Sequence, residues 1–340
     1  MHLKKKYFEL DASSVKQLQK LKGPIVIFGA GGFIGVNLLN TLLLYRNDVY
    51  GISQNHKNNW RFLATHSPKK NLQSCDITDI SILKELIDKL KPRTIFNLAA
   101  YGAYSKQKEY KKIYAANFNS TVNAIEILKE VGFDAYIHAG SSSEYGINSA
   151  CPDEQDELIP NSHYAVSKVA AYYAIKYYGK IEKLPVVDLR LYSVYGPWEE
   201  PDRLIPVLIS KAIKKEFPPL VSPEISRDFI YIKDVIRAFI LAAVKIKTLK
   251  GEALNIGSGK KTTIKQLTES VRKEFAIPGK PMFKGMKNRN WDVEDWFANI
   301  DNTKKKLGWK PEISLPEGLK LVESWQKEVD FDNAYWNWNK

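Results

Sequence analysis

A tyrosine and a lysine four residues apart, Tyr164 and Lys168 in the segment HYAVSK, are the residues of this sequence best suited to acid–base chemistry. In a helix, this spacing places both side chains on one face. A tyrosine normally titrates near pH ~10, and a nearby ammonium group lowers its pKa by favouring the phenolate. The phenolate can then take a proton from an alcohol while a hydride leaves the carbon that carries the oxygen. A surface pair without a role is the alternative.

Three consecutive serines, Ser141, Ser142 and Ser143, occur upstream in the segment GSSSEYG. They follow a predicted strand, and a hydroxyl at the end of that strand can hydrogen-bond a substrate oxygen and hold it beside the tyrosine. A serine-rich turn that only satisfies its own backbone is the alternative. The sequence therefore offers a base, a cationic neighbour and a positioning hydroxyl.

Residues 24–35 have the features of a dinucleotide site. The apolar run 25–28 is typical of a strand buried on both faces of a parallel sheet. Glycines follow in the spacing GxxGxxG, and an apolar helical pattern begins with them. Such a loop brings the N–H groups of a helix N-terminus close to a pyrophosphate, because glycine permits a close backbone approach. The residues predicted to surround the pyrophosphate are Gly29, Gly32, Phe33, Ile34 and Gly35.

Strands and helices alternate along the first part of the chain and must position these residues. We expect strands at 25–28, 48–52, 72–75, 94–98, 135–139 and 185–191, and helices at 80–90, 110–131 and 164–178. The alternation predicts an α/β fold with a Rossmann-type, doubly wound parallel sheet. The ligand of such a sheet lies at the carboxyl ends of its strands.

Beyond Tyr192, prolines interrupt the pattern and predict a smaller α/β lobe. Segments 228–232, 235–244 and 253–256 are expected to return to the main sheet. The predicted organisation is an N-terminal extension at 1–23, a cofactor-binding domain at 24–193 plus 228–257, and a substrate-binding lobe at 194–227 and 258–340.

Five motifs in order make the chain resemble the extended short-chain dehydrogenase/reductases that remodel nucleotide sugars. These are the glycine loop, the serine segment before Tyr145 and Gly146, the YxxxK pair, RDFIYIKD at 227–234 and NIGSG at 255–259. The resemblance covers roughly residues 24–325. It implies hydride transfer between a nicotinamide cofactor and C4 of a nucleotide-diphosphate sugar, with Tyr164 as the base. Lys168 would assist Tyr164 and bind the nicotinamide ribose.

The resemblance leaves the catalytic hydroxyl open between two serines. Counting back from Tyr145 selects Ser141, whereas matching Ser142-Ser143-Glu144 to the Thr-Ser-Glu of family dehydratases selects Ser142, which we favour slightly. Under the second alignment, Glu144 takes the place of an acid that helps eliminate water. A turn carboxylate without a catalytic role is the alternative for Glu144.

The resemblance also implies substrate-binding residues, mainly arginines. A guanidinium suits a phosphate because its fork donates two hydrogen bonds at once. Arg227 takes the position that meets the nucleotide or diphosphate, with a salt bridge to Asp228 or Asp234 as the alternative. Tyr192 would pass the nicotinamide. The predicted substrate-binding residues are Ser143, Arg190, Arg203, Arg227 and Arg289.

The end of the second strand normally separates NAD from NADP, since an acidic residue there binds the ribose 2′-hydroxyl of NAD. Ser53 occupies that position, and the basic residues His56, Lys57 and Arg61 follow it. We therefore favour NADP, with NAD possible. The resemblance places Asp76 and Ile77 at the adenine and leaves room for the cofactor at Ala99 and Ala100.

The composition excludes several other classes of protein. A net charge of +13 without a nucleic-acid-binding motif, on lysines scattered along helices, argues against a nucleic-acid partner. No apolar run approaches a membrane span. The two cysteines give no metal-binding spacing and predict a reducing, cytoplasmic location. The family resemblance implies a homodimer through the helices at 110–131 and 164–178.

Three functions follow from these motifs. The first is a nucleotide-sugar epimerase or dehydratase, the second an NADPH-dependent 4-keto-sugar reductase, and the third a non-catalytic, cofactor-binding regulatory protein. The retained Tyr164, Lys168 and serines argue against the third, because a protein that only binds the cofactor has no need of them.

Overall fold

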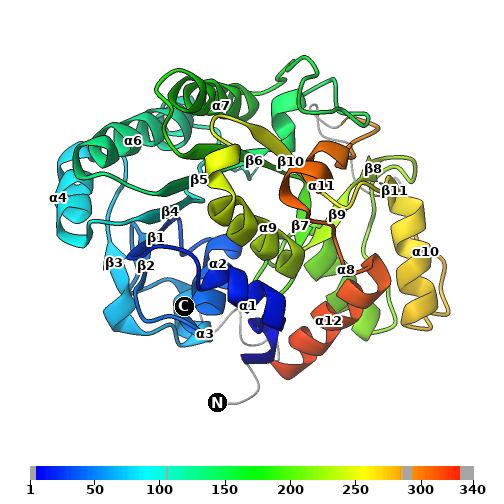
Figure 1. The fold of residues 1–340 in the computed structure, drawn as a ribbon. Coiled ribbons are helices and arrows are strands. Elements are labelled where there is room, and N and C mark those ends of the chain that lie inside the picture. Colours follow the sequence, from blue (N-terminus) through cyan, green and yellow to red (C-terminus); the bar gives the residue numbers. More distant parts are fainter. Residues whose placement is uncertain (1–4, 105, 284, 286–292, 330–340) are drawn as a thin grey trace.

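A seven-stranded parallel sheet lies at the centre of the molecule (Figure 1). The structure, a computed structural model, describes residues 5–104, 106–283, 285 and 293–329. The strands follow the order β10-β6-β5-β4-β1-β2-β3. Their bounds are β1 Ile25–Phe28, β2 Val49–Ser53, β3 Leu72–Ser74, β4 Thr94–Asn97, β5 Ala135–Ser141, β6 Val186–Leu191 and β10 Ala253–Ile256. The predicted doubly wound α/β fold is confirmed, and its strand order reverses between β1 and β4, where such folds bind ligands.

Helices cover both faces of this sheet. On one face, α4 (Ile80–Leu90), α6 (Ser120–Val131) and α7 (His163–Lys180) share a core with Val26 and Phe28 of β1. On the other face, the core is shared by Ile25 and Ile27 with α1 (Ala12–Leu18), α2 (Phe33–Leu43) and α9 (Ile232–Val244). β1 is therefore buried on both sides, as its uninterrupted apolar sequence predicts.

Two of the helices on the first face, α4 and α7, begin at residues whose side chains cap them. The Ser162 side chain accepts a hydrogen bond from the backbone N–H of Ala165 at the start of α7. Asp79 does the same for Ser81 and Ile82 at the start of α4. Each cap satisfies a backbone donor that has no partner within the helix. These caps fix where α7 begins and therefore where its first turns lie.

The long helix expected at 110–131 is interrupted in its middle. It consists of α5 (Tyr110–Tyr114), a π-helical turn at Ala115–Asn119, and α6. Within the turn, the amide of Asn117 donates to the carbonyl of Tyr101 at 2.9 Å and to the hydroxyl of Ser167 on α7 at 2.8 Å. The wider turn thus lets Asn117 tie α7 to the loop that follows β4.

The predicted N-terminal extension contributes to the same core. Phe8, Leu18 and Leu21 are buried among residues of β1, α2 and α9, and α1 packs against α9. Figure 1 shows α1 lying beside α9 on that face of the sheet. The segment is therefore packed onto the sheet before the first strand begins.

The remaining elements lie mostly in the second part of the chain. They are α3 Trp60–Thr65, β7 Ser193–Tyr195, α8 Leu204–Ile213, β8 Ser226–Arg227, β9 Phe229–Tyr231, β11 Thr262–Thr263, α10 Ile264–Glu274, α11 Asp301–Leu307 and α12 Leu315–Glu328, with 3-10 turns at Lys5–Tyr7, Lys69–Asn71, Ser142–Tyr145 and Ile246–Thr248. β8 pairs with β11, and β9 pairs with β7. The expectation that 228–232 rejoins the main sheet is wrong. The reason is that β5 and β10 occupy both edges of β6, so that only α9 and β10 return.

Across the described ranges, every helix is too short or too polar to cross a lipid bilayer.

Candidate active site

A cavity of about 670 Å³ opens beside the glycine loop and the first turns of α7. It is also lined by the loop after β4, the serines after β5 and the segment after β6. It brings together the predicted residues Gly29, Gly32, Phe33, Ile34, Gly35, Ala100, Ser141, Ser142, Ser143, Tyr164, Lys168, Tyr192, Arg203 and Arg227. The dinucleotide loop and the acid–base pair, far apart in sequence, thus meet in one place.

The glycine loop has no room for side chains. A Cβ atom at Gly29 would lie 2.7 Å from backbone atoms of Leu98 and Ala99, and Gly29 has a φ of +74° that favours glycine. A Cβ at Gly35 would collide with the carbonyl of Gly29. Gly32 precedes α2 and offers no side-chain cap, so the N–H groups of the first turn can serve an anion. This cradle fits the pyrophosphate of a dinucleotide.

Tyr164 and Lys168 lie one turn apart on α7 and both line the cavity. Burial raises the pKa of Tyr164 to about 12, and a hydrogen bond with Ser141 partly opposes that rise. Lys168 is buried, and its Nζ donates to the carbonyl of Ala139 at 2.7 Å. Burial lowers the pKa of Lys168, whereas the carboxylates of Asp188 and Glu144 raise it.

Ser141 is the serine that contacts the tyrosine. Its hydroxyl accepts a hydrogen bond from the backbone N–H of Ser143 at 3.1 Å, which leaves the hydroxyl proton available for another acceptor. The hydrogen bond with Tyr164 comes from the same side chain. Ser142 also lines the cavity and is nine-tenths buried or more. This geometry favours Ser141 over Ser142 as the positioning hydroxyl.

Glu144 and Arg190 form a buried ion pair away from the cavity. Oε2 of Glu144 accepts from Nε of Arg190 at 2.7 Å, and Oε1 accepts from the backbone N–H of Ser141 at 2.8 Å. Arg190 also donates to the Tyr145 hydroxyl at 2.8 Å. Both side chains are 0% exposed. This pairing disfavours the predicted roles of Glu144 as an acid for elimination and of Arg190 as a substrate ligand, because each charge is paired with the other.

Two of the remaining predicted arginines reach the cavity. The guanidinium of Arg227 lies over the ring of Trp296, 5.2 Å from its centroid. The alternative of a salt bridge from Arg227 is disfavoured, because Asp228 accepts from Ser258 and Gly259 while Asp234 pairs with Arg237. Arg203 lies at the start of α8, and its Nε is 3.8 Å from Glu199. Arg289 lies outside the described residues.

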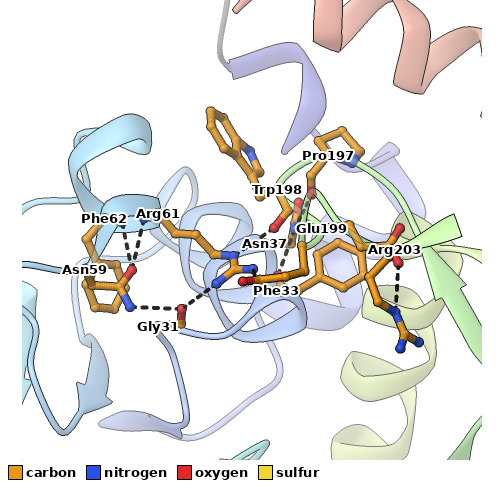
Figure 2. Close-up of polar contacts among 11 residues, drawn as sticks. Gly31, Phe33, Asn37, Asn59, Arg61, Phe62, Pro197, Trp198, Glu199 and Arg203 are labelled. Atoms are coloured by element: carbon orange, nitrogen blue, oxygen red, sulfur yellow. Dashed lines mark hydrogen bonds and ion pairs between the residues drawn. The ribbon is translucent and has the colours of Figure 1, made fainter. Parts of the chain in front are cut away.

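Arg61, one of the basic residues that favoured NADP, has other partners. Figure 2 shows it donating to the carbonyls of Trp198 at 2.8 Å and Gly31 at 3.5 Å. It also pairs with Glu200. Asn37 of α2 donates to the carbonyl of Pro197 at 2.8 Å, so the segment after β7 is tied to the glycine loop from two sides. Arg61 is buried in these contacts.

The other residues predicted for the adenosine half lie beside the cavity rather than in its lining. Asp76 accepts from Gln54 at 3.0 Å, and a Cβ at Gly31 would lie 2.8 Å from the hydroxyl of Ser53. Lys57 is exposed. Ile77 and Ala99 pack against the core that contains Phe28 and Ile52. These residues surround the carboxyl ends of β2, β3 and β4.

Sequence reasoning missed a buried acid in the cavity. Glu199 is 6% exposed, and burial raises its pKa to about 8, with Arg203 and Arg61 opposing the rise. Figure 2 shows its side chain between Phe33 and Arg203. The only sequence signal was an acidic pair after Pro197, which also fits an exposed loop. Tyr104 from the loop after β4 lines the same region.

Comparison with known proteins identifies the family. Residues 25–257 match the model of the NAD dependent epimerase/dehydratase family. A UDP-glucuronate 4-epimerase of Thermodesulfobacterium geofontis is 30% identical over 90% of this chain and 97% of its own length. A UDP-glucose 4-epimerase of Mycolicibacterium smegmatis is 29% identical over 88% of this chain and 97% of its own.

A solved structure agrees with these relatives. The UDP-glucuronic acid 4-epimerase of Bacillus cereus, in complex with UDP-glucuronic acid and NAD, is 26% identical with a TM-score of 0.78 over 90% of this chain and 99% of that one. The resemblance inferred from the five motifs is confirmed. The chain belongs to the NAD-dependent epimerase/dehydratase family and is an enzyme of that class.

Proposed function

We propose that the protein is a 4-epimerase of a nucleotide-diphosphate hexose. The observation that carries this proposal is the meeting of Tyr164, Ser141 and Lys168 beside the glycine loop in one cavity. Ser141 orients the C4 hydroxyl, and Tyr164 takes its proton. NAD supplies the chemistry that removes the C4 hydride and returns it. Tyr164 then gives the proton back to the oxygen once C4 has been reduced from the opposite face, so no cofactor is consumed.

Epimerisation is favoured over dehydration by the surroundings of Glu144. Elimination of water needs a second acid or base near the sugar in addition to the tyrosine. Both oxygens of Glu144 are taken by Arg190 and by the backbone of Ser141. Among the described residues that line the cavity, the one acidic side chain is Glu199, which lies beside Arg203. The carboxylate expected beside the serines is therefore absent from the described lining.

NAD is the cofactor that the site supports best. Three basic residues near Ser53 favoured NADP. One of them, Arg61, is buried against Glu200 and backbone carbonyls, so it is not available to bind a 2′-phosphate. The neutral Ser53 can accept or donate a hydrogen bond to a ribose hydroxyl. The related structure from Bacillus cereus contains NAD. A cofactor titration that gave tighter binding of NADP than of NAD would reverse this assignment.

The experiment that tests the function is incubation with a panel of nucleotide hexoses, with and without added NAD, followed by product identification. The expected product is the C4 epimer, formed without net consumption of cofactor. Formation of a 4-keto-6-deoxy sugar would identify a dehydratase, and stoichiometric oxidation of NADPH a reductase. Cofactor binding without turnover of any sugar would favour the regulatory alternative.

The assignment of the hydroxyl can be tested with two neighbouring alanine variants. Ser141→Ala should lower kcat about 100-fold, since it removes a hydrogen bond made to the reacting oxygen. Ser142→Ala should lower kcat much less, because Ser141 supplies the contact with Tyr164. Steady-state rates on the best sugar of the panel measure both. A larger loss of kcat in Ser142→Ala than in Ser141→Ala would instead assign the positioning hydroxyl to Ser142, as the alignment with the dehydratases does.

The enzyme is proposed to act as a homodimer through α7. Tyr173 and Tyr177 are 55% and 51% exposed, and Ile181 is 68% exposed. Their spacing places these side chains on one face of the helix, which can pack against a second copy. Sedimentation velocity would show a dimer that Tyr173→Glu/Tyr177→Glu dissociates, and a monomeric wild type would refute it.

A further inference from the structure

Three buried polar residues lie side by side on the face of the sheet covered by α6 and α7. In the strand register, Asn97 of β4 is the partner of His138 of β5, and His138 is the partner of Asp188 of β6. Asn97 is 2% exposed, and the other two are 0% exposed. Asn97 donates to the hydroxyl of Tyr136 at 2.7 Å, so its end of the row has hydrogen-bond partners.

Asp188 differs from the rest of this row. Among the described residues, neither of its carboxylate oxygens has a hydrogen-bond partner. Burying a carboxylate without donors is costly, and natural proteins retain such groups mainly where they have a task. Val186, two residues before Asp188 and on the same face of β6, is buried and apolar, so this face of the strand has no general need for polar residues.

The carboxylate lies next to the peptide that holds Lys168. Nζ of Lys168 donates to the carbonyl of Ala139 at 2.7 Å. Gly140 follows Ala139, and a Cβ atom there would lie 2.7 Å from Oδ1 of Asp188. The ammonium group and the carboxylate therefore approach the same two residues of β5. Glycine at position 140 provides the space that Asp188 occupies.

Asp188 is the carboxylate near Lys168 that has no ion pair among the described residues. Burial and Glu144 raise the pKa of Asp188 well above its ordinary value, whereas the positive charges of Arg190 and Lys168 oppose that rise and favour the ionised carboxylate. The groups that face Lys168 are Glu144 from the turn after β5, Arg190 and Asp188 from β6, and His138 from β5. Glu144 is already paired with Arg190 at 2.7 Å. Burial and the nearby Lys168 lower the pKa of His138 well below its usual value, so His138 is neutral.

We propose that Asp188 is a positioning residue for the reaction, whose carboxylate keeps the buried Lys168 charged in the cavity that it shares with Tyr164. The proposal rests on the proposed roles of Tyr164 and Lys168. Burial alone lowers the pKa of Lys168, and Asp188 is the strongest of the charges that raise it. A charged Lys168 favours the phenolate, so Asp188 acts on the tyrosine through the lysine.

The test is Asp188→Asn, which keeps the shape of the side chain and removes its charge. Loss of the carboxylate should lower the pKa of Lys168 further and lower the maximal rate by about tenfold. The alkaline limb of the pH–rate profile should move to lower pH. The midpoint temperature of thermal unfolding should not fall, because the variant no longer buries an unpartnered carboxylate. A purely structural aspartate would lower the midpoint and leave the profile unmoved.

His138→Gln is the matched control, since it changes a neutral group in the same row. Its pH–rate profile should coincide with that of the wild type. Calorimetric binding of NAD at pH 7 and pH 9 gives a second readout that needs no sugar. Asp188→Asn should weaken NAD binding at pH 9 more than at pH 7, because Lys168 loses its charge at lower pH.

The outcomes separate this inference from the proposed function. Wild-type turnover together with unchanged pH dependence in Asp188→Asn would overturn the inference alone, and so would a variant that fails to fold. A wild type that binds NAD but converts no sugar would overturn the proposed function. In that case, the NAD affinities at the two pH values still decide whether Asp188 controls the charge of Lys168.

Discussion

Tyr164→Phe should lower turnover by at least about 10³-fold while leaving the affinity for NAD nearly unchanged. The substitution removes one oxygen atom and keeps the ring that lines the cavity. Ser141 contacts that oxygen, and Lys168 lies one turn away on the same helix. Without the phenol, the proton of the C4 hydroxyl has no suitable acceptor, since the Ser141 hydroxyl is a weak base and Nζ of Lys168 is engaged with the carbonyl of Ala139. The glycine loop that holds the pyrophosphate is not touched.

Tyr104→Phe is the control for this prediction. Tyr104 lines the same cavity, and burial raises the pKa of its phenol too, but Tyr104 comes from the loop after β4 rather than from α7. It should keep most of the wild-type rate. Rates and NAD binding measured for both variants separate loss of a base from loss of a tyrosine. A Tyr164→Phe enzyme with the wild-type rate would show that another group takes the proton.

Features carried by local patterns could be predicted from the sequence. The apolar run at 25–28, the glycine spacing and the helix expected at 80–90 each depend on neighbouring residues, and the structure has β1, the tight loop and α4 there. The pair Tyr164 and Lys168 could be assigned for the same reason, because an i, i+4 spacing on a helix fixes which side chains share a face.

Features that depend on a distant partner could not be predicted. The sequence makes Glu144 a candidate catalytic acid because nothing near it in sequence reveals Arg190 on the next strand of the sheet. Arg61 favours NADP as a basic residue shortly after Ser53, because its partner, Glu200, follows it by more than a hundred residues and does not show in the local sequence. In each case the side chain is charged, as its residue type implies, but the position of its ion-pair partner determines whether that side chain can contact a ligand. A single sequence does not contain that information.

The strand at 229–231 could likewise be predicted as a strand, but its pairing partner could not. Its apolar sequence identifies a strand but not the edge to which it adds. β10 arrives later in the chain and takes the free edge of β6, which leaves β9 to pair with β7. The π-helical turn at Ala115–Asn119 is similar, because it depends on what Asn117 meets on α7 and after β4.

Glu144→Ala should destabilise the protein by about 3–5 kcal/mol, the cost of leaving a buried charge without its partner. Arg190 is 0% exposed and would retain only neutral acceptors, such as the Tyr145 hydroxyl and the carbonyl of Glu154. The turn that presents Ser141 would also lose the hydrogen bond to its backbone N–H. Urea unfolding at neutral pH measures the change in the free energy of unfolding.

Replacing both partners distinguishes a structural pair from a catalytic acid. In Glu144→Met/Arg190→Met no charge remains buried, so much of the lost stability should return. Glu130→Ala, which breaks an exposed pair with Lys84, should leave the free energy of unfolding almost unchanged. If Glu144→Ala were as stable as the wild type yet inactive, the carboxylate would be part of the chemistry, and elimination of water would again be a candidate reaction. The expected loss of stability instead assigns Glu144 to holding the serine turn in place, which leaves the chemistry to the hydroxyl of Ser141 and the phenol of Tyr164.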